Sequence, residues 1–276
     1  MSESTKAEVK AESKVTSTMT IDRQKVALVT GAAKRIGRTI ALALAERGWD
    51  VIVHFNYSSA EATDTVAAIT RMGRRSIALR CNLSDEAAVR ALIPDAVAWC
   101  GPQGRLSCVV NNASLFEQDS AADFSWRSLD AHMHANLAAP IVLAQALHAV
   151  TADGEQSVVV NLLDQKLFNL NPDFLSYTLS KAALQTATTM LAQALAPRVR
   201  VVGVAPGITM VSGDQSESGF AQAHTVTPLG RSSTPQDVAD AVCFVAEARA
   251  MTGTTLLVDG GQHLIPLTRD VMFLAT

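Results

Sequence analysis

The stretch VALVTGAAKRIGRTIALAL, residues 26–44, decides the fold class. It begins with an apolar run typical of a buried strand, turns at Gly31 and Gly37, and ends with the apolar spacing of a helix. The two glycines allow a tight turn and a close approach of the helix to the strand. A helix that starts there offers free backbone N–H groups and a positive dipole end to an anion. We interpret the stretch as a pyrophosphate-binding strand–turn–helix unit, with an ordinary βα turn as the alternative.

The same alternation of strand and helix continues outward from this unit. Further apolar runs are DVIVHF, SIALRCNL, LSCVVNNAS, SVVVNLLD, RVRVVGVAPG and TTLLVDG. Helical segments are expected at about 36–47, 59–72, 85–98, 125–150, 174–196 and 235–248. Runs this apolar are typical of parallel strands that are covered on both faces. The pattern predicts an α/β fold: one Rossmann-like, doubly wound parallel sheet of about seven strands with helices on both faces.

Three segments divide the chain. Residues 1–22 are small, polar and of mixed charge, which predicts a disordered tail. Residues 23–262 contain no linker or change of composition and are expected to form one domain. Residues 263–276 carry several apolar side chains, so this C-terminal tail is expected to pack on a neighbouring subunit.

Composition excludes several classes of partner. The chain has 276 residues, 48% of them hydrophobic, and a net charge of −3, so no bulk field favours nucleic acid or an anionic membrane. No apolar run is long enough to span a bilayer. The four cysteines are scattered without a CxxC pair, which suits reduced thiols in a cytoplasmic protein. His132 and His134 are two residues apart and do not share a helix face, so no metal site is expected.

Positive charge gathers at the glycine turn. Lys34, Arg35 and Arg38 flank the expected helix start, and Arg35 stands where a dinucleotide fingerprint has its middle glycine. Cations at a helix N-terminus oppose the helix dipole and cost stability unless an anion binds there. The turn is therefore expected to hold a polyanionic ligand.

The end of the second strand indicates which dinucleotide binds. A cofactor without a 2′-phosphate is usually held by an acidic residue roughly 20 residues after the turn, yet no acid occurs before Glu61. Asn56 and Ser58 can instead hydrogen-bond a phosphate, and His54 is expected to lie near it. These residues favour NADP(H) over NAD(H). Ser58 and Ser59 are also suited to cap the next helix.

Tyr177 and Lys181 lie four residues apart on an expected helix and therefore share one face. An ammonium near a phenol stabilises the phenolate, so Lys181 is expected to lower the pKa of Tyr177 from about 10. Such a phenol could donate a proton near neutral pH. Asp164 stands where the preceding buried strand ends, which would bring a carboxylate to the same edge of the sheet.

Residues 25–262 resemble the short-chain dehydrogenases/reductases through TGAAKRIG, NNAS, HANLAAP, YTLSK, APGI and VDGGQ, which occur in that order. The resemblance implies that Tyr177 is the acid/base and that Lys181 binds the nicotinamide ribose. It implies that Asn136 supports a proton-relay water. The expected cofactor-binding residues are Gly31, Lys34, Arg35, Ile36, Gly37, His54, Asn56, Ser58, Asn82, Leu83, Asn112, Ala113, Ser114, Tyr177, Lys181, Pro206, Gly207 and Ile208.

The chain departs from the family pattern at two positions. Asp164 replaces the usual serine after the fifth strand, and Arg35 replaces a glycine. Both departures, together with NNASLF and YTLSKAAL, resemble the pteridine reductases, including dihydromonapterin/dihydrofolate reductase-type members. That resemblance implies substrate contacts from Arg35, Ser114, Phe116, Asp164 and Tyr177, with Phe116 stacked on a pterin.

The expected function is NADPH-dependent reduction of a dihydropterin such as dihydrobiopterin, dihydromonapterin or dihydrofolate, with Tyr177 and Asp164 delivering the proton. One alternative is a short-chain reductase of a carbonyl substrate such as a 3-oxoacyl thioester. Another is a non-catalytic NADP-binding regulator, which the presence of Asn136, Tyr177 and Lys181 disfavours. Family resemblance further implies a homotetramer with helices 125–150 and 174–196 at an interface.

Overall fold

The computed structural model describes residues 23–211 and 216–273, so the expected disordered tail of residues 1–22 lies outside the described residues. One sheet of seven parallel strands runs through the molecule in the order β3-β2-β1-β4-β5-β6-β7. The strands are β1 (Gln24–Val29), β2 (Asp50–Phe55), β3 (Ser76–Arg80), β4 (Gly104–Asn111), β5 (Ser157–Leu162), β6 (Val199–Pro206) and β7 (Thr255–Val258). The predicted Rossmann-like fold class is confirmed.

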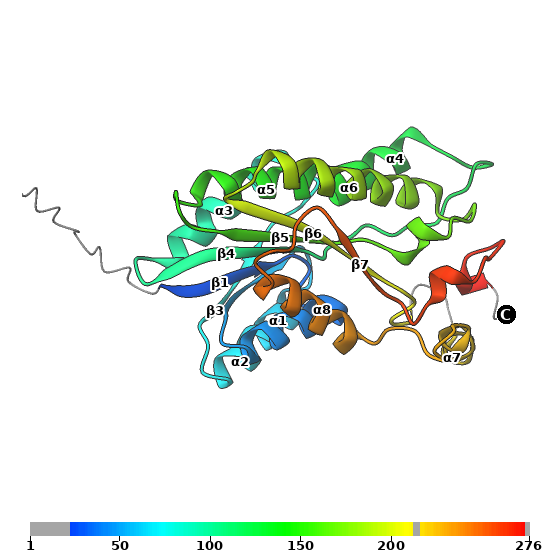
Figure 1. Cartoon of the computed structure of the whole chain (residues 1–276), viewed down its shortest axis with the longest axis horizontal. Coiled ribbons are helices and arrows are strands. Elements are labelled where there is room, and N and C mark those ends of the chain that lie inside the picture. The colour runs from blue at the N-terminus through cyan, green and yellow to red at the C-terminus, as the bar shows by residue number, and fades with distance from the viewer. Residues whose placement is uncertain (1–22, 212–215, 274–276) are drawn as a thin grey trace, which may run out of the picture.

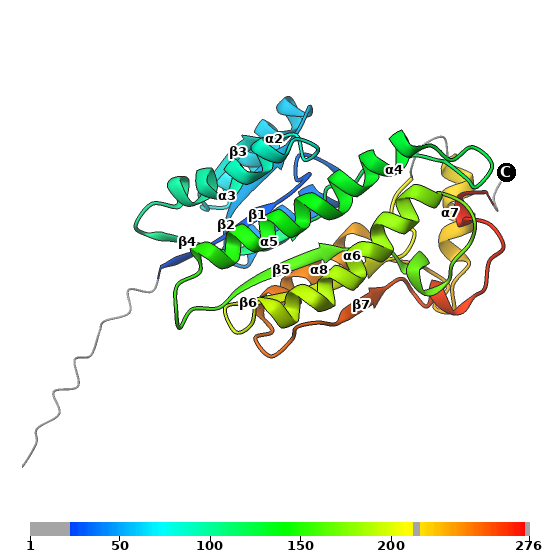
Figure 2. The same cartoon turned by 90° about the horizontal axis from the view of Figure 1, so that it is seen from above.

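Helices cover both faces of the sheet (Figure 1). On one face lie α1 (Arg35–Glu46), α2 (Ser59–Arg71) and α8 (Pro235–Glu247). On the other lie α3 (Glu86–Cys100), α5 (Ala139–Val150) and α6 (Leu175–Ala194), which run side by side in Figure 2. Shorter elements are α4 (Trp126–Met133), η1 (His134–Ala138), η2 (Gln165–Phe168), α7 (Glu217–Thr225), η3 (Gln262–Leu264) and η4 (Val271–Phe273).

The central strand β1 shows why its sequence is apolar throughout. Ala27 and Val29 pack into the core on the side of α1 and α8, and Val26 and Leu28 pack into the core on the side of α3 and α5. All four side chains are fully buried. A strand with a core on each face has no solvent side, so the alternation of polar and apolar residues disappears.

The long helical segment at 125–150 is continuous but irregular. Its middle turn, η1, is a π-helix in which the N–H of Ala139 bonds to the carbonyl of His134. Pro140 follows and has no N–H, so the carbonyl four residues earlier cannot receive an ordinary helical hydrogen bond. Trp126–Val150 is also long and apolar enough to cross a membrane by length and composition, a test that core helices pass as well. Leu143 and Leu147 on it are buried against the sheet.

Two regions differ from the sequence expectations. The helix α7 (Glu217–Thr225) is not among the helical segments expected from the sequence. The C-terminal segment, which we define as residues 265–273, folds back onto its own chain and reaches the carboxyl ends of β5 and β6. Its expected role at a subunit interface stays a prediction.

Candidate active site

The glycine turn leads into a helix start, that of α1, which has no side-chain cap. Lys34 precedes the helix without a side-chain cap, and the first turn contains no acidic residue. By contrast, α3 and α8 begin with the side chains of Asp85 and Thr234 accepting backbone N–H groups. The N–H groups at the start of a helix need acceptors, so an uncapped start beside the crevice of a doubly wound sheet is suited to a phosphate. Arg35 adopts a left-handed φ of 56°, the conformation that glycine supplies in the usual fingerprint.

Close packing fixes this turn against β4. A Cβ atom on Gly37 would lie 2.3 Å from the carbonyl oxygen of Gly31 and 2.5 Å from Nδ2 of Asn112. Nδ2 of Asn112 donates to the carbonyl of Thr30 at 2.8 Å. The backbone N–H of Ala113 donates to the hydroxyl of Thr30 at 3.0 Å. Gly37, Asn112 and Ala113 therefore shape the crevice at the point where the strand order reverses around β1.

His54 is buried beneath the glycine turn, where its side chain binds backbone groups and has no face open to a cofactor phosphate. It is 2% exposed, and its Nδ1 accepts the N–H of Gly31 at 3.0 Å, so Nε2 carries the proton and lies 3.1 Å from the carbonyl of Cys81. Burial lowers the pKa of His54 to about 4, so the ring is neutral. The expectation of a direct contact between His54 and the cofactor phosphate is wrong, because both ring nitrogens already bind backbone groups.

The other residues expected near the adenosine end lie where β2 and β3 finish. Phe55 and Arg80 are in register, which brings the segments that follow them side by side. The carbonyl of Asn56 accepts a hydrogen bond from Nε of Arg80 at 3.1 Å. Ser58 precedes α2 and does not cap it with its side chain. Oδ1 of Asn82 accepts the N–H of Ser84 at 3.1 Å, and Leu83 packs against the core.

Asp164, Tyr177 and Lys181 meet at the end of β5, as the sequence predicted. The Tyr177 hydroxyl donates to Oδ2 of Asp164 at 2.8 Å, and Oδ1 of Asp164 accepts the N–H of Lys166 at 2.8 Å. Nζ of Lys181 donates to the carbonyl of Leu162 at 2.7 Å and lies 5.8 Å from the centre of the Tyr177 ring. Tyr177 and Lys181 are 7% and 3% exposed.

The protonation of this group differs from the expectation in one respect. Burial, followed by the charge of Asp164, raises the pKa of Tyr177 well above its ordinary value. Lys181 was expected to lower that pKa, but burial lowers the pKa of Lys181 itself to about 8. Burial also raises the pKa of Asp164. Desolvation disfavours every charged form here, so Tyr177 holds its proton tightly and could donate it only to a strong developing base.

Asn136 holds the loop that carries Ser114. Its Oδ1 accepts the N–H of Leu115 at 2.8 Å and the Ser114 hydroxyl at 3.2 Å. Its Nδ2 donates to the carbonyl of Leu115 at 2.9 Å and to the hydroxyl of Ser180 at 3.0 Å. Asn136 is 1% exposed and comes from the π turn η1. Its position links the loop after β4 to the helix of Tyr177, and its role in a proton relay stays a prediction.

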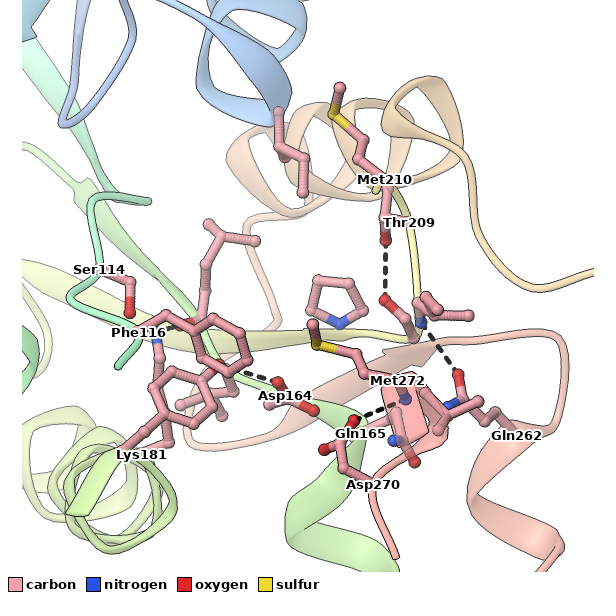
Figure 3. A pocket seen from close by; sticks show the side chains of 18 of the residues that line it. Ser114, Phe116, Asp164, Gln165, Lys181, Thr209, Met210, Gln262, Asp270 and Met272 are labelled. Atoms are coloured by element: carbon pink, nitrogen blue, oxygen red, sulfur yellow. Dashed lines mark hydrogen bonds between the residues drawn. The ribbon is translucent and has the colours of Figure 1, made fainter. Parts of the chain in front are cut away.

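A cavity of about 260 Å³ joins these parts (Figure 3). Sequence-predicted residues that line it are Arg35, Ile36, Asn112, Ser114, Phe116, Asp164, Tyr177, Lys181, Pro206, Gly207 and Ile208. Residues that sequence reasoning missed are Leu162, Leu163, Gln165, Thr209, Met210, Gln262, Asp270, Val271 and Met272. Gln262 belongs to the VDGGQ motif and could have been inferred from it. The residues from the C-terminal segment follow no periodic pattern that would place them here.

Aromatic rings form one wall of the cavity. The ring of Phe116 stacks on Phe174 with centroids 4.4 Å apart and meets Tyr177 edge-on at 4.7 Å. Phe174 in turn stacks on Phe273 at 5.9 Å. Phe116 is 39% exposed, so its ring keeps apolar surface available beside Asp164 and Tyr177. A flat substrate ring could pack there.

A family model described as enoyl-(acyl carrier protein) reductase matches residues 31–263. The chain belongs to the short-chain dehydrogenase/reductase family of oxidoreductases. An uncharacterised oxidoreductase of Methylorubrum extorquens is 34% identical over 86% of this chain and 97% of its own length. The 3-oxoacyl-[acyl-carrier-protein] reductase FabG of Staphylococcus aureus is 31% identical over 87% and 98%. The structure of FolM alternative dihydrofolate reductase 1 from Brucella canis, complexed with NADP, has a TM-score of 0.83, with 37% identity over 91% of this chain and 98% of that one.

Proposed function

We propose that the chain is an NADPH-dependent reductase of a dihydropterin. The observation that carries the proposal is the carboxylate of Asp164, which accepts the hydrogen bond of Tyr177 and lines the same cavity as Phe116 and Arg35. A simple ketone needs only a proton donor and a hydride. A pterin ring has amino, keto and ring-nitrogen groups that a carboxylate can recognise. The likeness to the Brucella dihydrofolate reductase supports this choice.

The residues of the glycine turn fit NADP(H). The uncapped start of α1 suits the pyrophosphate, and a side chain on Gly37 would fill the space beside Gly31. Lys34 and Ser58 would hold the 2′-phosphate, and Lys181 would hold the nicotinamide ribose. When bound, the cofactor supplies the hydride. Relatives crystallised with NADP support the assignment.

The chain itself supplies the proton and the orientation. Phe116 would hold the pterin flat, so that its C=N bond lies beside Tyr177. Tyr177 would donate its proton to the ring nitrogen as the carbon accepts the hydride. Asp164 would stabilise the protonated donor before transfer and help return a proton to it afterwards. Arg35 would lie between the cofactor phosphates and the polar edge of the pterin.

The test follows NADPH oxidation with the purified protein. Dihydrobiopterin, dihydromonapterin and dihydrofolate are compared with an acetoacetyl thioester, with a reaction lacking substrate as the control. Pterin-dependent oxidation supports the proposal and ranks the pterins. Oxidation with the thioester alone would overturn it and assign the chain to the carbonyl reductases.

Asp164→Ser restores the residue usual in the family and separates the two chemistries. We expect kcat/KM for the pterin to fall by about 10²-fold, the lower range for the loss of an acid–base partner, with a smaller effect on any ketone that is reduced. Gln165→Ala, one residue further along the same cavity wall, is the control for a local disturbance. Unchanged pterin turnover in Asp164→Ser would remove Asp164 from pterin chemistry.

A carbonyl substrate is the second candidate. It is favoured by the 31% identity to a 3-oxoacyl reductase over nearly the full length of both chains. Tyr177 and Lys181 would serve that reaction as well, since a proton must reach the developing alkoxide. The thioester arm of the assay tests it directly.

A further inference from the structure

The C-terminal segment contributes a second carboxylate to the cavity. Asp270 lines the cavity together with Asp164, and 14% of its side-chain surface is exposed. Its Oδ1 accepts the N–H of Met272 at 3.1 Å, and its Oδ2 accepts Nζ of Lys166 at 3.1 Å. Lys166 is almost fully buried behind it, with 3% of its side chain exposed. The carboxylate is therefore the part of this ion pair that faces the cavity.

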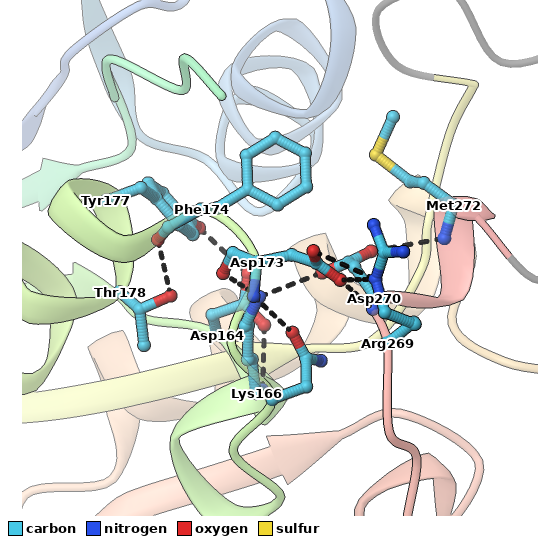
Figure 4. Close-up of polar contacts among 10 residues, drawn as sticks. Asp164, Lys166, Asp173, Phe174, Tyr177, Thr178, Arg269, Asp270 and Met272 are labelled. Carbon is cyan, nitrogen blue, oxygen red and sulfur yellow. Dashed lines mark hydrogen bonds and ion pairs between the residues drawn. The ribbon is translucent and has the colours of Figure 1, made fainter. Parts of the chain in front are cut away.

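Lys166 connects the C-terminal segment to Asp164, the hydrogen-bond partner of Tyr177 (Figure 4). Its backbone N–H bonds to Asp164 and its side chain bonds to Asp270, so one residue holds both carboxylates. The neighbouring Asp173 accepts Nε of Arg269 at 2.9 Å and the N–H of Asp270 at 2.7 Å. The network ties the C-terminal segment to the loop between β5 and α6, which positions Asp164 and Tyr177.

We infer that Asp270 is a positioning residue for proton delivery. While the C-terminal segment lies against the cavity, the negative charge of Asp270 keeps the proton on the hydrogen-bonded pair of Asp164 and Tyr177. The inference rests on the proposed role of that pair in the reduction. A negative charge near a phenol that is hydrogen-bonded to a carboxylate disfavours the loss of the phenol proton. In agreement with this, the charge of Asp270 contributes to the raised pKa of both Asp164 and Tyr177, after burial as the main cause.

Other charged and titratable groups also lie around the Asp164–Tyr177 pair, and the test variants leave all of these groups unchanged. Lys181 comes from α6, Lys166 from η2, and Arg35 from the start of α1. His132 on α4 lies 6.5 Å from the Tyr177 ring. Its Nε2 accepts the N–H of Glu117, and its Nδ1 lies 2.8 Å from the carbonyl of Ser128.

The first readout is the pH dependence of kcat with any substrate that the wild type reduces. Asp270→Asn removes the charge and keeps the shape. The acid should then lose its proton at lower pH, so the alkaline fall of kcat should move down by about one pH unit. Asp270→Glu keeps the charge and should leave the fall near its wild-type position. Asp153→Asn removes a carboxylate that is 87% exposed and paired with Arg198, and controls for net charge.

The second readout needs no substrate. The chain has two tyrosines, so Tyr57→Phe leaves Tyr177 as the single source of tyrosinate absorbance. In that background, Asp270→Asn should lower the pH at which the phenolate appears. NADPH binding by fluorescence verifies that each variant is folded, and Asp270→Ser carries the same test if the asparagine variant does not fold.

The outcomes separate the two proposals. An unshifted tyrosinate titration and an unshifted alkaline fall in Asp270→Asn would overturn the role of Asp270. An equal shift in Asp153→Asn would also overturn it, since the effect would then be one of net charge. If no pterin is reduced but Tyr177 titrates at lower pH in Asp270→Asn, the proposed substrate is wrong and the role of Asp270 stands.

Discussion

Tyr177 is held as a neutral donor by three neighbours of different kinds. Asp164 accepts its hydrogen bond, Phe116 covers it edge-on, and Lys181 lies against its ring. Its raised pKa means that the proton leaves only for a strongly basic acceptor, such as the nitrogen or oxygen that forms when a double bond accepts a hydride. In the proposed reaction, Tyr177 would therefore give up its proton only as the substrate accepts the hydride, and no phenolate would be needed beforehand.

Replacing Tyr177 by phenylalanine should remove turnover and leave cofactor binding intact. The ring packing is preserved, and only the donated proton is lost. We expect kcat to fall by about 10³-fold, within the usual range for a general acid, while the Kd for NADPH changes less than about twofold. Tyr57→Phe, at a side chain 83% exposed, is the matched control. Equal losses of binding and turnover would show that Tyr177 is a structural residue.

His54 should make stability depend on pH. Its pKa is about 4 in the folded protein and about 6.5 when unfolded, so between these values the unfolded chain binds more protons. Stability contributed by the neutral ring is present above pH 6.5 and is lost as the pH falls toward 4, by about 3 kcal/mol in total.

The measurement is urea unfolding of His54→Gln and wild type at pH 7.5 and 4.5. The variant should be less stable at pH 7.5, because Gly31 and Cys81 lose well-aligned partners, but its stability should fall less on acidification. His134→Gln, at an exposed histidine, is the control. If wild type and His54→Gln lost the same free energy of unfolding between pH 7.5 and 4.5, the His54 ring would not be the acid-sensitive group.

Site residues that belong to a sequence motif could be predicted from the sequence. Site residues that reach the cavity only through the folding of a distant segment could not. Asp164, Tyr177 and Lys181 follow from strand ends and helical spacing, and they meet as predicted. Asp270 is 106 residues from Asp164 in sequence and reaches it only because the C-terminal segment folds back. His54 has the right position for a ligand contact, but its burial depends on the packing of the turn above it.

At the scale of elements, the C-terminal segment is a wall of the cavity held by a buried ion pair, Lys166–Asp270, and by a second pair near the surface. Arg269 pairs with Asp173 at 2.9 Å, and 52% of the arginine side chain is exposed. Phe273 adds an apolar contact through its stack with Phe174. A wall fastened this way can loosen without disturbing the core, because the sheet carries its own hydrophobic clusters.

Arg269→Ala should weaken substrate binding selectively. With the segment loosened, we expect KM for the reduced substrate to rise by about three- to tenfold and the Kd for NADPH to stay constant. Added salt should raise KM in the wild type more than in the variant, because screening weakens exposed pairs. Arg198→Ala breaks an exposed pair with Asp153 away from the cavity and is the control. A wild-type KM in Arg269→Ala would show that the segment needs no such fastening.

The π turn η1 shows what local sequence rules overlook. Apolar spacing predicts one helix over 125–150, and that helix exists, but Pro140 widens the turn before it. The widened turn carries Asn136, whose side chain bonds the loop of Ser114 and the helix of Tyr177. Periodicity locates a helix, whereas a bulge within it depends on a hydrogen bond that proline cannot make.

At the scale of the whole molecule, the face formed by α4 and α6 exposes apolar side chains in the single chain. Trp126 on α4 is 77% exposed, and Leu179 and Met190 on α6 are 46% and 62% exposed. Figure 2 shows that these helices lie next to each other on one face of the sheet. Exposed apolar side chains on one face favour burial in an assembly, in line with the expected homotetramer.

The double variant Leu179→Glu/Met190→Glu should reduce the assembly. Buried charges without partners oppose association, so light scattering should give a lower mass than for wild type, whose mass should be about four times the 29.2 kDa of one chain. Met72→Glu, at a side chain 41% exposed after α2, is the control. A wild-type mass of one chain, or an unchanged mass in the double variant, would exclude this face as the interface.

The position of the C-terminal segment also decides where the protein can be joined to another one. Met272 lines the cavity, and three residues separate Phe273 from the end of the sequence. Bulk attached next to Phe273 would therefore lie beside the cavity and press on its wall. The amino ends of the strands lie on the opposite side of the sheet, so bulk attached next to Gln24 at the start of β1 would lie away from the cavity (Figure 1).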